Sequence, residues 1–239
     1  MPSSPVPIPG LVLAAGTGSR YGTPKALVRG DDGAPWLIRT IRTLAAAGCS
    51  PVIVVLGARA DEARALLSEY SLTAATDAPP ATSIDALTPP VVVAQADDWA
   101  EGLSASLRTG LRAAAALVTE PDAVAIVPVD VPGLLASTVQ RLIGPLPSAL
   151  SGAPSQSGST FEDLSGETGS EASVGPDTLR QARFHGRPGH PVVIGRAHWA
   201  ELIRSAGGDT GARPYLQAHP TQLVECSDLE TGLDVDRPD

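Results

Sequence analysis

The sequence is poor in aromatic residues and in cysteine, and both shortages restrict what the protein can be. Aromatic side chains make up 3% of the 239 residues and hydrophobic residues 43%, so the core must be built from Ala, Val, Leu and Ile. Such a core suits parallel strands covered by alanine-rich helices. The two cysteines, Cys49 and Cys226, provide neither a disulfide framework nor zinc-ligand spacing, which makes a reducing cytoplasm the expected location.

The sequence also lacks a long apolar segment and an excess of positive charge. No apolar run approaches the roughly 18 residues of a membrane helix, so we expect no membrane association. The formal net charge of -9 argues against a nucleic-acid partner, because binding to a polyanion requires a broad cationic surface. The few cations are therefore expected to act locally.

Short apolar runs alternate with amphipathic stretches along the chain. Strands are predicted at 11–14, 52–56, 91–93, 123–127, 191–194 and 223–226. Helices are predicted at 35–47, 61–70, 97–114, 134–143, 198–206 and 212–219. This alternation predicts a single α/β domain over residues 1–239 with a parallel sheet. Residues 71–90 are expected to form a surface loop, and the Ser, Gly and Pro-rich stretch at about 145–178 is expected to be a disordered low-complexity insertion.

The stretch from Leu11 to Leu27 is the strongest candidate for a binding site. An apolar run is followed there by three glycines and two cations, namely Gly16, Gly18, Gly22, Arg20 and Lys25. Glycines let backbone amides turn toward an anion, and the cations supply charge for phosphate oxygens. The spacing fits neither the P-loop nor the dinucleotide fingerprint, in which Tyr21 would have to be glycine. A tight turn that needs glycine for geometry alone is the other interpretation, and the two cations argue against it.

Carboxylates at two distant places could bind a metal ion. Asp130 follows a predicted strand at its carboxyl end, where α/β sheets bind ligands, although it could also cap the helix that comes next. Asp234, Asp236 and Asp239 lie near the end of the sequence, where a solvated acidic tail is the alternative. If the two groups converge, they would suit Mg²⁺, which takes one or two protein carboxylates beside substrate phosphates.

The glycine-rich stretch, Leu-Val-Leu-Ala-Ala-Gly-Thr-Gly-Ser-Arg-Tyr-Gly-Thr-Pro-Lys over residues 11–25, resembles the signature loop of the MobA-like nucleotidyltransferases, in particular the molybdenum cofactor cytidylyltransferase branch. The resemblance implies a three-layer Rossmann-like nucleotidyltransferase fold with a mostly parallel sheet. It implies catalytic roles for Arg20, Lys25 and Asp130. It also implies a nucleotide-binding role for the loop residues Ala14, Ala15, Gly16, Thr17 and Gly18. An alanine at position 15 resembles the branch that uses CTP, whereas the guanylyl branch usually has glycine there.

Five further segments extend the resemblance. Pro-Val-Asp-Val-Pro at 128–132 and the acidic segment 234–239 resemble the segments that carry the family's magnesium ligands, which implies Asp130 and Asp236 as ligands here, although the second segment is one residue shorter than in the family. Segment 97–111 resembles the part that reads the base, which implies contacts from Gly102, Ser104 and Ser106; Ser104 could also be a helix cap. Segments 186–196 and 208–213 resemble the acceptor pocket, which implies acceptor contacts from His190, Asp209 and Arg213.

The activity implied by the resemblance is transfer of CMP from CTP to a phosphorylated acceptor, with Mg²⁺ as cofactor and pyrophosphate as the leaving group. The implied acceptor is molybdopterin or its molybdenum-loaded form, and the product could be delivered to a molybdoenzyme. Two alternatives stay open. An NAD(P)H-dependent oxidoreductase of the nicotine-blue type is disfavoured by the missing dinucleotide fingerprint, and a non-catalytic nucleotide-binding module is disfavoured by the retained charged residues.

Overall fold

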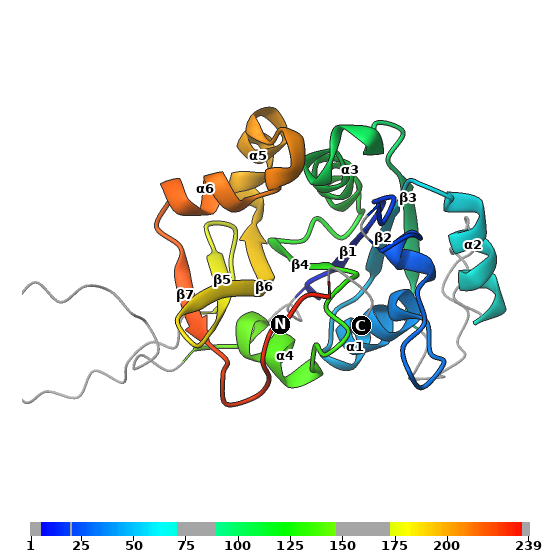
Figure 1. The fold of residues 1–239 in the computed structure, drawn as a ribbon. Coiled ribbons are helices and arrows are strands. Elements are labelled where there is room, and N and C mark those ends of the chain that lie inside the picture. Colours follow the sequence, from blue (N-terminus) through cyan, green and yellow to red (C-terminus); the bar gives the residue numbers. More distant parts are fainter. Residues whose placement is uncertain (1–5, 20, 71–88, 147–172, 236–239) are drawn as a thin grey trace, which may run out of the picture.

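The computed structural model describes residues 6–19, 21–70, 89–146 and 173–235, and its centre is one seven-stranded sheet with the order β3-β2-β1-β4-β6-β5-β7 (Figure 1). The strands are Gly10–Ala14 (β1), Val52–Leu56 (β2), Val91–Gln95 (β3), Ala123–Pro128 (β4), Leu179–Phe184 (β5), Arg187–Gly195 (β6) and Gln222–Glu225 (β7). The first four strands are parallel to one another, β6 is antiparallel to both β4 and β5, and β7 is parallel to β5. The expected mostly parallel sheet is confirmed.

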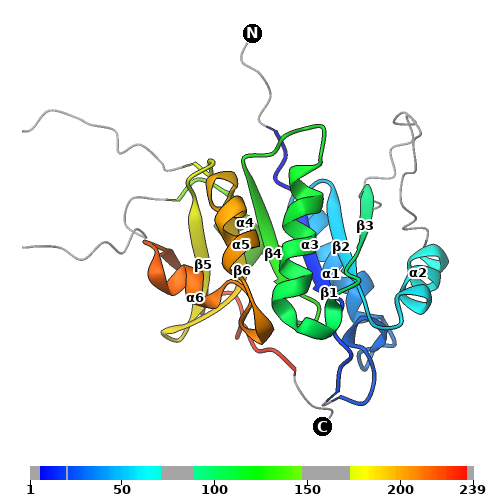
Figure 2. The same cartoon turned by 90° about the horizontal axis from the view of Figure 1, so that it is seen from above.

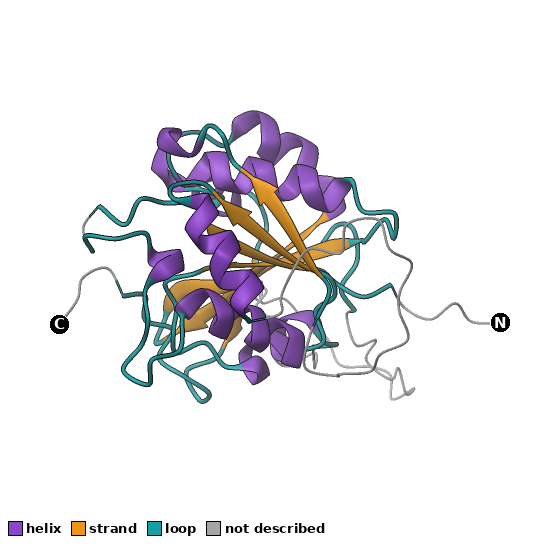
Figure 3. Ribbon diagram, turned by 90° about the vertical axis from the view of Figure 1, so that its right-hand side faces the viewer, coloured by secondary structure: helices purple, strands orange, loops and turns teal. Residues whose placement is uncertain are grey.

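Helices cover both faces of this sheet. They are Trp36–Ala46 (α1), Ala60–Glu69 (α2), Leu103–Ala115 (α3), Ala136–Ile143 (α4), Trp199–Ser205 (α5) and Arg213–Ala218 (α6). In the fully buried strand β1, Val12 and Ala14 pack with α1, α2 and α4, whereas Leu11 and Leu13 pack with α3, α5 and α6. In Figure 2 α3 and α5 lie in front of the strands and α1 and α4 behind them, and Figure 3 shows helices on both sides of the sheet. The three-layer α/β architecture is therefore confirmed.

Two helices begin later than the sequence predicts, and this decides two of the open alternatives. Before α3, the residues Trp99–Glu101 form a separate 3₁₀ turn (η2), and Gly102 stands at the cap position with a φ of 110°. The prediction that Ser104 could cap this helix is wrong. Helix α4 begins at Ala136 with Leu135 at its cap position, so Asp130 is not a helix cap either.

Strand β5 has no counterpart in the sequence-based prediction, and β6 is longer than predicted. The two strands form a hairpin that adds an antiparallel half to the sheet. Strand β5 was missed because its sequence, Leu-Arg-Gln-Ala-Arg-Phe, is half polar. Its Arg180 is nevertheless buried, and the guanidinium donates hydrogen bonds to the carbonyls of Leu142 (2.9 Å) and Gly144 (2.8 Å) at the end of α4.

Most of the two predicted irregular stretches, residues 71–88 and 147–172, lies outside the described residues. The described edges of the second stretch differ from the prediction, because Leu146 is buried and Val174 packs against the same core. The carbonyl of Pro176 also accepts a hydrogen bond from the backbone N–H of Ala197. Leu146 and Val174, at the two edges of the predicted insertion, therefore contribute side chains to the folded core. No helix in the described ranges is long and apolar enough to cross a membrane.

Candidate functional site

A cleft of about 750 Å³ opens at the carboxyl ends of β1 and β4. Strand β1 has β2 on one side and β4 on the other, so the cleft lies where the order of the parallel strands reverses. This is the place where open α/β sheets bind ligands. The lining residues are at positions 13–19, 25, 26, 99, 100, 102, 103, 106, 128–130, 209 and 213.

The glycine loop forms one wall of the cleft, and its two central glycines differ in whether a side chain would fit there. Gly18 has a φ of 63°, and a Cβ atom there would lie 1.8 Å from the carbonyl oxygen of Thr23. Its own carbonyl accepts hydrogen bonds of 2.8 Å from the N–H groups of Tyr21 and Gly22, which closes the turn. At Gly16 a Cβ atom would meet nothing within 4 Å. The fold therefore requires glycine at position 18, whereas position 16 leaves open space through which a ligand could approach the backbone.

The structure brings together two of the three predicted catalytic residues. Lys25 Nζ donates a hydrogen bond of 2.7 Å to Asp130 Oδ2 across 105 positions of sequence. The two side chains are 16% and 21% exposed, so the pair is shielded from solvent while still lining the cleft. Asp130 is held beside the loop because the N–H of Val129 donates to the carbonyl of Leu13 at 3.1 Å and so continues the pairing of β4 with β1. Arg20, the third predicted residue, lies outside the described ranges.

The C-terminal segment also reaches Asp130. The N–H of Val235 donates a 2.9 Å hydrogen bond to the carbonyl of Asp130. Asp236, the second predicted magnesium ligand, follows in the sequence but lies outside the described residues. Within the described part of the chain no three His, Cys, Asp or Glu residues gather as a metal site. A single carboxylate in a cleft that could hold phosphate oxygens nevertheless fits Mg²⁺, which needs few protein ligands beside its substrate.

The predicted base-reading segment lies at the start of α3, and the structure separates its three predicted contacts. Gly102 and Ser106 line the cleft. Ser104 does not, because its side chain is 0% exposed within the core and its Oγ has no hydrogen-bond partner. A contact between its hydroxyl and a bound base is therefore excluded in this conformation. A Cβ atom at Gly102 would lie 2.1 Å from Asp209 Oδ1, so this carboxylate sits directly against the cap of α3.

Two of the three predicted acceptor contacts line the cleft. Asp209 lies in the 3₁₀ turn Gly208–Thr210 (η5) and Arg213 begins α6. Neither side chain forms a hydrogen bond or ion pair with another described residue, so both are available to a ligand. His190 lies in β6 and does not line the cleft, and its Nδ1 is buried without a hydrogen-bond partner. Burial lowers the pKa of His190 although the charges of Asp130 and Asp234 oppose this, which favours a neutral imidazole.

One lining residue that the sequence reasoning did not single out is Trp99, the aromatic residue in η2. The turn that carries it is braced by Arg108, whose guanidinium donates hydrogen bonds to Asp98 (2.7 Å) and Glu101 (2.6 Å). Arg108 also donates to the carbonyl of Ala206 at the end of α5, at 3.0 Å. The hydrogen bond from Arg108 lowers the pKa of the Asp98 carboxyl group. The scarcity of aromatic residues was the signal that could have drawn attention to this position.

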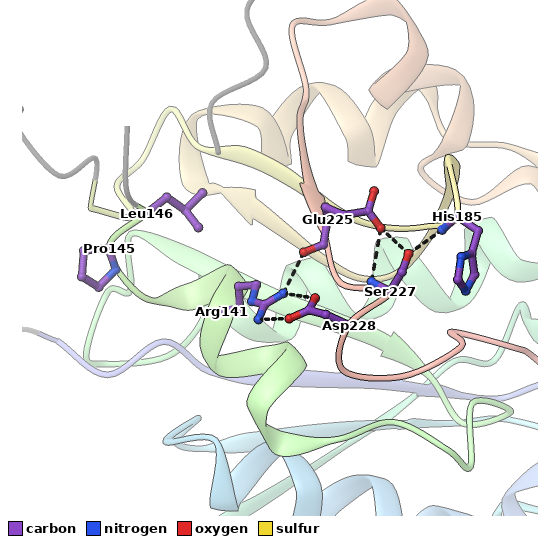
Figure 4. A pocket seen from close by; sticks show the side chains of 7 residues that line it. All are labelled: Arg141, Pro145, Leu146, His185, Glu225, Ser227 and Asp228. Carbon is purple, nitrogen blue, oxygen red and sulfur yellow. Dashed lines mark hydrogen bonds and ion pairs between the residues drawn. The ribbon is translucent and has the colours of Figure 1, made fainter. Parts of the chain in front are cut away.

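A second pocket, of about 800 Å³, lies between the end of α4 and the segment after β7 (Figure 4). None of the predicted site residues lines it, and its Arg141, Asp228 and Glu225 side chains already form ion pairs within the protein. Arg141 donates two hydrogen bonds to Asp228, at 2.6 and 2.8 Å, and a third of 2.9 Å to the carbonyl of Glu225. Hydrogen bonds from Ser227 and Arg183 lower the pKa of Glu225 to about 2. These contacts fasten α4 to the C-terminal segment, and the first cleft is the better candidate for chemistry.

Known proteins resemble this chain over most of its length. The family model described as the MobA-like NTP transferase domain matches residues 10–223. The chain is 31% identical to nicotine blue oxidoreductase from Paenarthrobacter nicotinovorans, an alignment that covers 96% of this chain and 92% of that protein.

Solved structures resemble the fold at lower identity. The crystal structure of Rv0371c from Mycobacterium tuberculosis H37Rv is 24% identical, with a TM-score of 0.64 over 98% of this chain and 94% of that one. A second structure of that protein, in complex with manganese, is 23% identical, with a TM-score of 0.55 over 92% of this chain and 87% of that one. A nucleotidyl transferase from Methanothermobacter thermautotrophicus is 21% identical, with a TM-score of 0.63 over 96% of this chain and 92% of that one. These structures support the fold.

Proposed function

Because the chain belongs to the MobA-like NTP transferase family and is therefore a nucleotidyltransferase, we propose that it transfers CMP from CTP to a phosphorylated small-molecule acceptor and releases pyrophosphate. The observation that carries the proposal is the contact between Lys25 and Asp130 at 2.7 Å, in a cleft walled by the glycine loop. The contact places a cation and a metal-type carboxylate beside a loop suited to phosphates.

The reaction asks the protein mainly for positioning and for neutralisation of charge. An acceptor phosphate oxygen attacks the α-phosphorus of CTP, the bond from that phosphorus to the bridging oxygen breaks, and pyrophosphate leaves. Backbone amides of residues 15–18, with Arg20, would hold the β and γ phosphates. Lys25 would neutralise charge on the α-phosphoryl oxygens. The attacking phosphate is already ionised, so no general base is needed.

A divalent cation would be held by Asp130 and Asp236 and would neutralise the charge of the phosphates. We propose Mg²⁺ for this role. The manganese complex of Rv0371c supports use of a divalent cation in a protein of this fold. Asp130 suits the task because its carboxylate lines the cleft, where it is paired with the Lys25 ammonium group.

The acceptor is proposed to bind at the end of the cleft where Arg213 begins α6. Its guanidinium has no partner among the described residues and would pair with the acceptor phosphate. We propose molybdopterin or its molybdenum-loaded form as the acceptor, with the product delivered to a molybdoenzyme. His190 does not line the cleft, so it would influence the acceptor only indirectly, through its electrostatic interaction with Arg213.

The test is release of pyrophosphate when the protein is incubated with each NTP, Mg²⁺ and molybdopterin. We expect release with CTP and a loss of about a hundredfold or more in Asp130→Asn, because the carboxylate that holds the cation is gone. Asp228→Asn is the matched control, since Asp228 pairs with Arg141 in the second pocket and should leave the rate unchanged. Absence of pyrophosphate with every NTP, together with NAD(P)H-dependent dye reduction, would overturn the proposal in favour of the activity named for the Paenarthrobacter relative.

A further inference from the structure

We propose that Trp99 is the platform on which the nucleobase of the NTP stacks. The inference rests on the proposed function and adds a residue that positions the nucleotide. Among the described residues that line the cleft, Trp99 is the only aromatic one. It lines the same cleft as Gly102 and Ser106, two of the three predicted base contacts.

The position of Trp99 relative to the phosphate loop is fixed by close packing. A Cβ atom at Gly57, the residue after β2, would lie 2.6 Å from Trp99 Cβ and 2.7 Å from the carbonyl oxygen of Ala15. Trp99 and Ala15 of the loop therefore both pack closely against a position that has no room for a side chain. The N–H of Ala58 donates to the same Ala15 carbonyl at 3.0 Å. This packing fixes the position of the Trp99 Cβ atom relative to the loop whose backbone amides would hold the phosphates.

The turn that carries the ring is also held from its other side. Arg108, which is 14% exposed, forms ion pairs with both Asp98 and Glu101, the residues that flank the Trp99–Ala100 pair. One guanidinium thus ties both ends of a short turn to α3. A platform that is already rigid loses little conformational entropy when a ligand stacks on it.

Trp99 is more exposed than the other two tryptophans, as expected of a residue that binds a ligand. Trp36 is 4% exposed and Trp199 is 2% exposed, and the Trp199 indole N–H donates to the carbonyl of Ile194 at 2.9 Å. Trp99 is only partly buried, and its indole N–H donates to no described residue. A tryptophan that served only the core would be covered like its two counterparts.

Stacking and base selection would then be separate tasks. Every base has a π face, so an indole platform adds affinity for all nucleotides and does not select among them. Selection would come from hydrogen-bonding groups elsewhere in the cleft, such as the hydroxyl of Ser106, which also lines it. Losing the ring should therefore weaken all nucleoside triphosphates by a similar factor.

Intrinsic tryptophan fluorescence provides the test. Trp36 and Trp199 are buried, so quenching by a stacked base would come from Trp99. CTP with Mg²⁺ is expected to quench the signal, and inorganic tripolyphosphate with Mg²⁺, which has no base, is expected to bind without quenching. Trp99→Leu should weaken CTP by about tenfold or more and leave tripolyphosphate affinity unchanged. Trp99→Phe should keep CTP affinity within about threefold, since the smaller ring still stacks. Trp199→Phe is the matched control and should keep the full quenching. Thermal unfolding of each variant checks the fold.

The outcomes distinguish this inference from the proposed function. One outcome of calorimetry is that CTP binds to the wild type without quenching its fluorescence, and that Trp99→Leu binds CTP as tightly as the wild type. In that case Trp99 is not the platform and the proposed function stands. Equal weakening of CTP and tripolyphosphate in Trp99→Leu would also overturn the inference, because the ring would then support the phosphate loop instead. If no NTP binds and none yields pyrophosphate, both conclusions fail.

Discussion

We expect the contact between Lys25 and Asp130 to open when a metal ion binds, because the ion would need the carboxylate that the ammonium group now holds at 2.7 Å. A cation–carboxylate pair of this kind is strong when partly shielded from water. The triphosphate offers Lys25 a more highly charged partner, so nucleotide and metal should bind together rather than one after the other.

This competition can be tested with Mn²⁺ as the metal. In the absence of nucleotide, Lys25→Met should raise the affinity for Mn²⁺ by about threefold or more, because the competing cation is removed. The same variant should bind CTP more weakly. Electron paramagnetic resonance of free Mn²⁺ measures the first effect and calorimetry the second. An unchanged or reduced Mn²⁺ affinity would show that Lys25 does not compete for Asp130.

The two central glycines of the loop offer a second prediction. Gly18→Ala should lower the free energy of unfolding by about 1–3 kcal/mol, because a left-handed φ and a close backbone oxygen both oppose a side chain there. Gly16→Ala should change it by less than about 0.5 kcal/mol, since its Cβ would meet nothing within 4 Å. We still expect weaker CTP binding in Gly16→Ala, because the methyl group occupies the approach to the backbone. Urea unfolding measures the stability of both variants, and CTP titration measures the affinity of Gly16→Ala. An affinity equal to that of the wild type would contradict the interpretation.

At the scale of elements, β5 and β7 are tied by a charged contact whose pH dependence has a defined sign. Arg183 donates to Glu225 at 2.8 Å, and with Ser227 it lowers the pKa of Glu225 from 4.5 to about 2. A carboxyl group with a lowered pKa stabilises the folded protein above its ordinary pKa, and this contribution disappears as the pH falls toward the folded value.

Glu225→Gln should therefore destabilise the protein most above about pH 5 and progressively less between pH 5 and pH 2. Urea unfolding of wild type and variant over this range measures the difference. Glu120→Gln is the control, because Glu120 is 78% exposed and its oxygen lies 3.9 Å from Arg196, so little pH dependence is expected. A difference between wild type and Glu225→Gln that does not vary with pH would contradict this account.

How well the sequence predicted each element depended on whether its signal was local. The apolar run Val52–Leu56 is buried at every position and was recognised as a strand. Strand β5 was missed because its arginines find their partners far away in sequence, where no local pattern can indicate them. The break before α3 was missed because the constraint on Gly102 comes partly from a distant segment: a Cβ atom there would lie 2.1 Å from Asp209 Oδ1.

The candidate site was predicted to a similar degree. The glycine loop and Asp130 follow strands whose carboxyl ends meet at one edge of the sheet, so their convergence could be inferred. The side-chain directions of Ser104 and His190 could not, because both depend on which face of the element turns toward the core. The roles of Arg20 and Asp236 stay predictions.

At the scale of the whole molecule, the predicted insertion should be dispensable for folding. Replacing residues 148–171 by a glycine–serine linker of about ten residues should change the melting temperature by less than about 3 °C and leave pyrophosphate release unchanged. The reason is composition, since this stretch has few large apolar side chains with which to stabilise a fold. Leu146 and Val174 must be kept because they pack in the core. Calorimetric scanning and the pyrophosphate assay measure the result, and loss of cooperative unfolding would contradict the prediction.

The side chain of Arg108 forms hydrogen bonds with two segments next to the cleft. It holds the turn of Trp99 through Asp98 and Glu101, and it holds the carbonyl of Ala206, which precedes the turn of Asp209. We therefore expect linkage between the two substrates, because a shift of one turn would change the hydrogen bonds that Arg108 offers to the other. By thermodynamic reciprocity, nucleotide must then alter acceptor affinity by the same factor as acceptor alters nucleotide affinity. In Arg108→Gln the two substrates should bind independently, with that factor close to one.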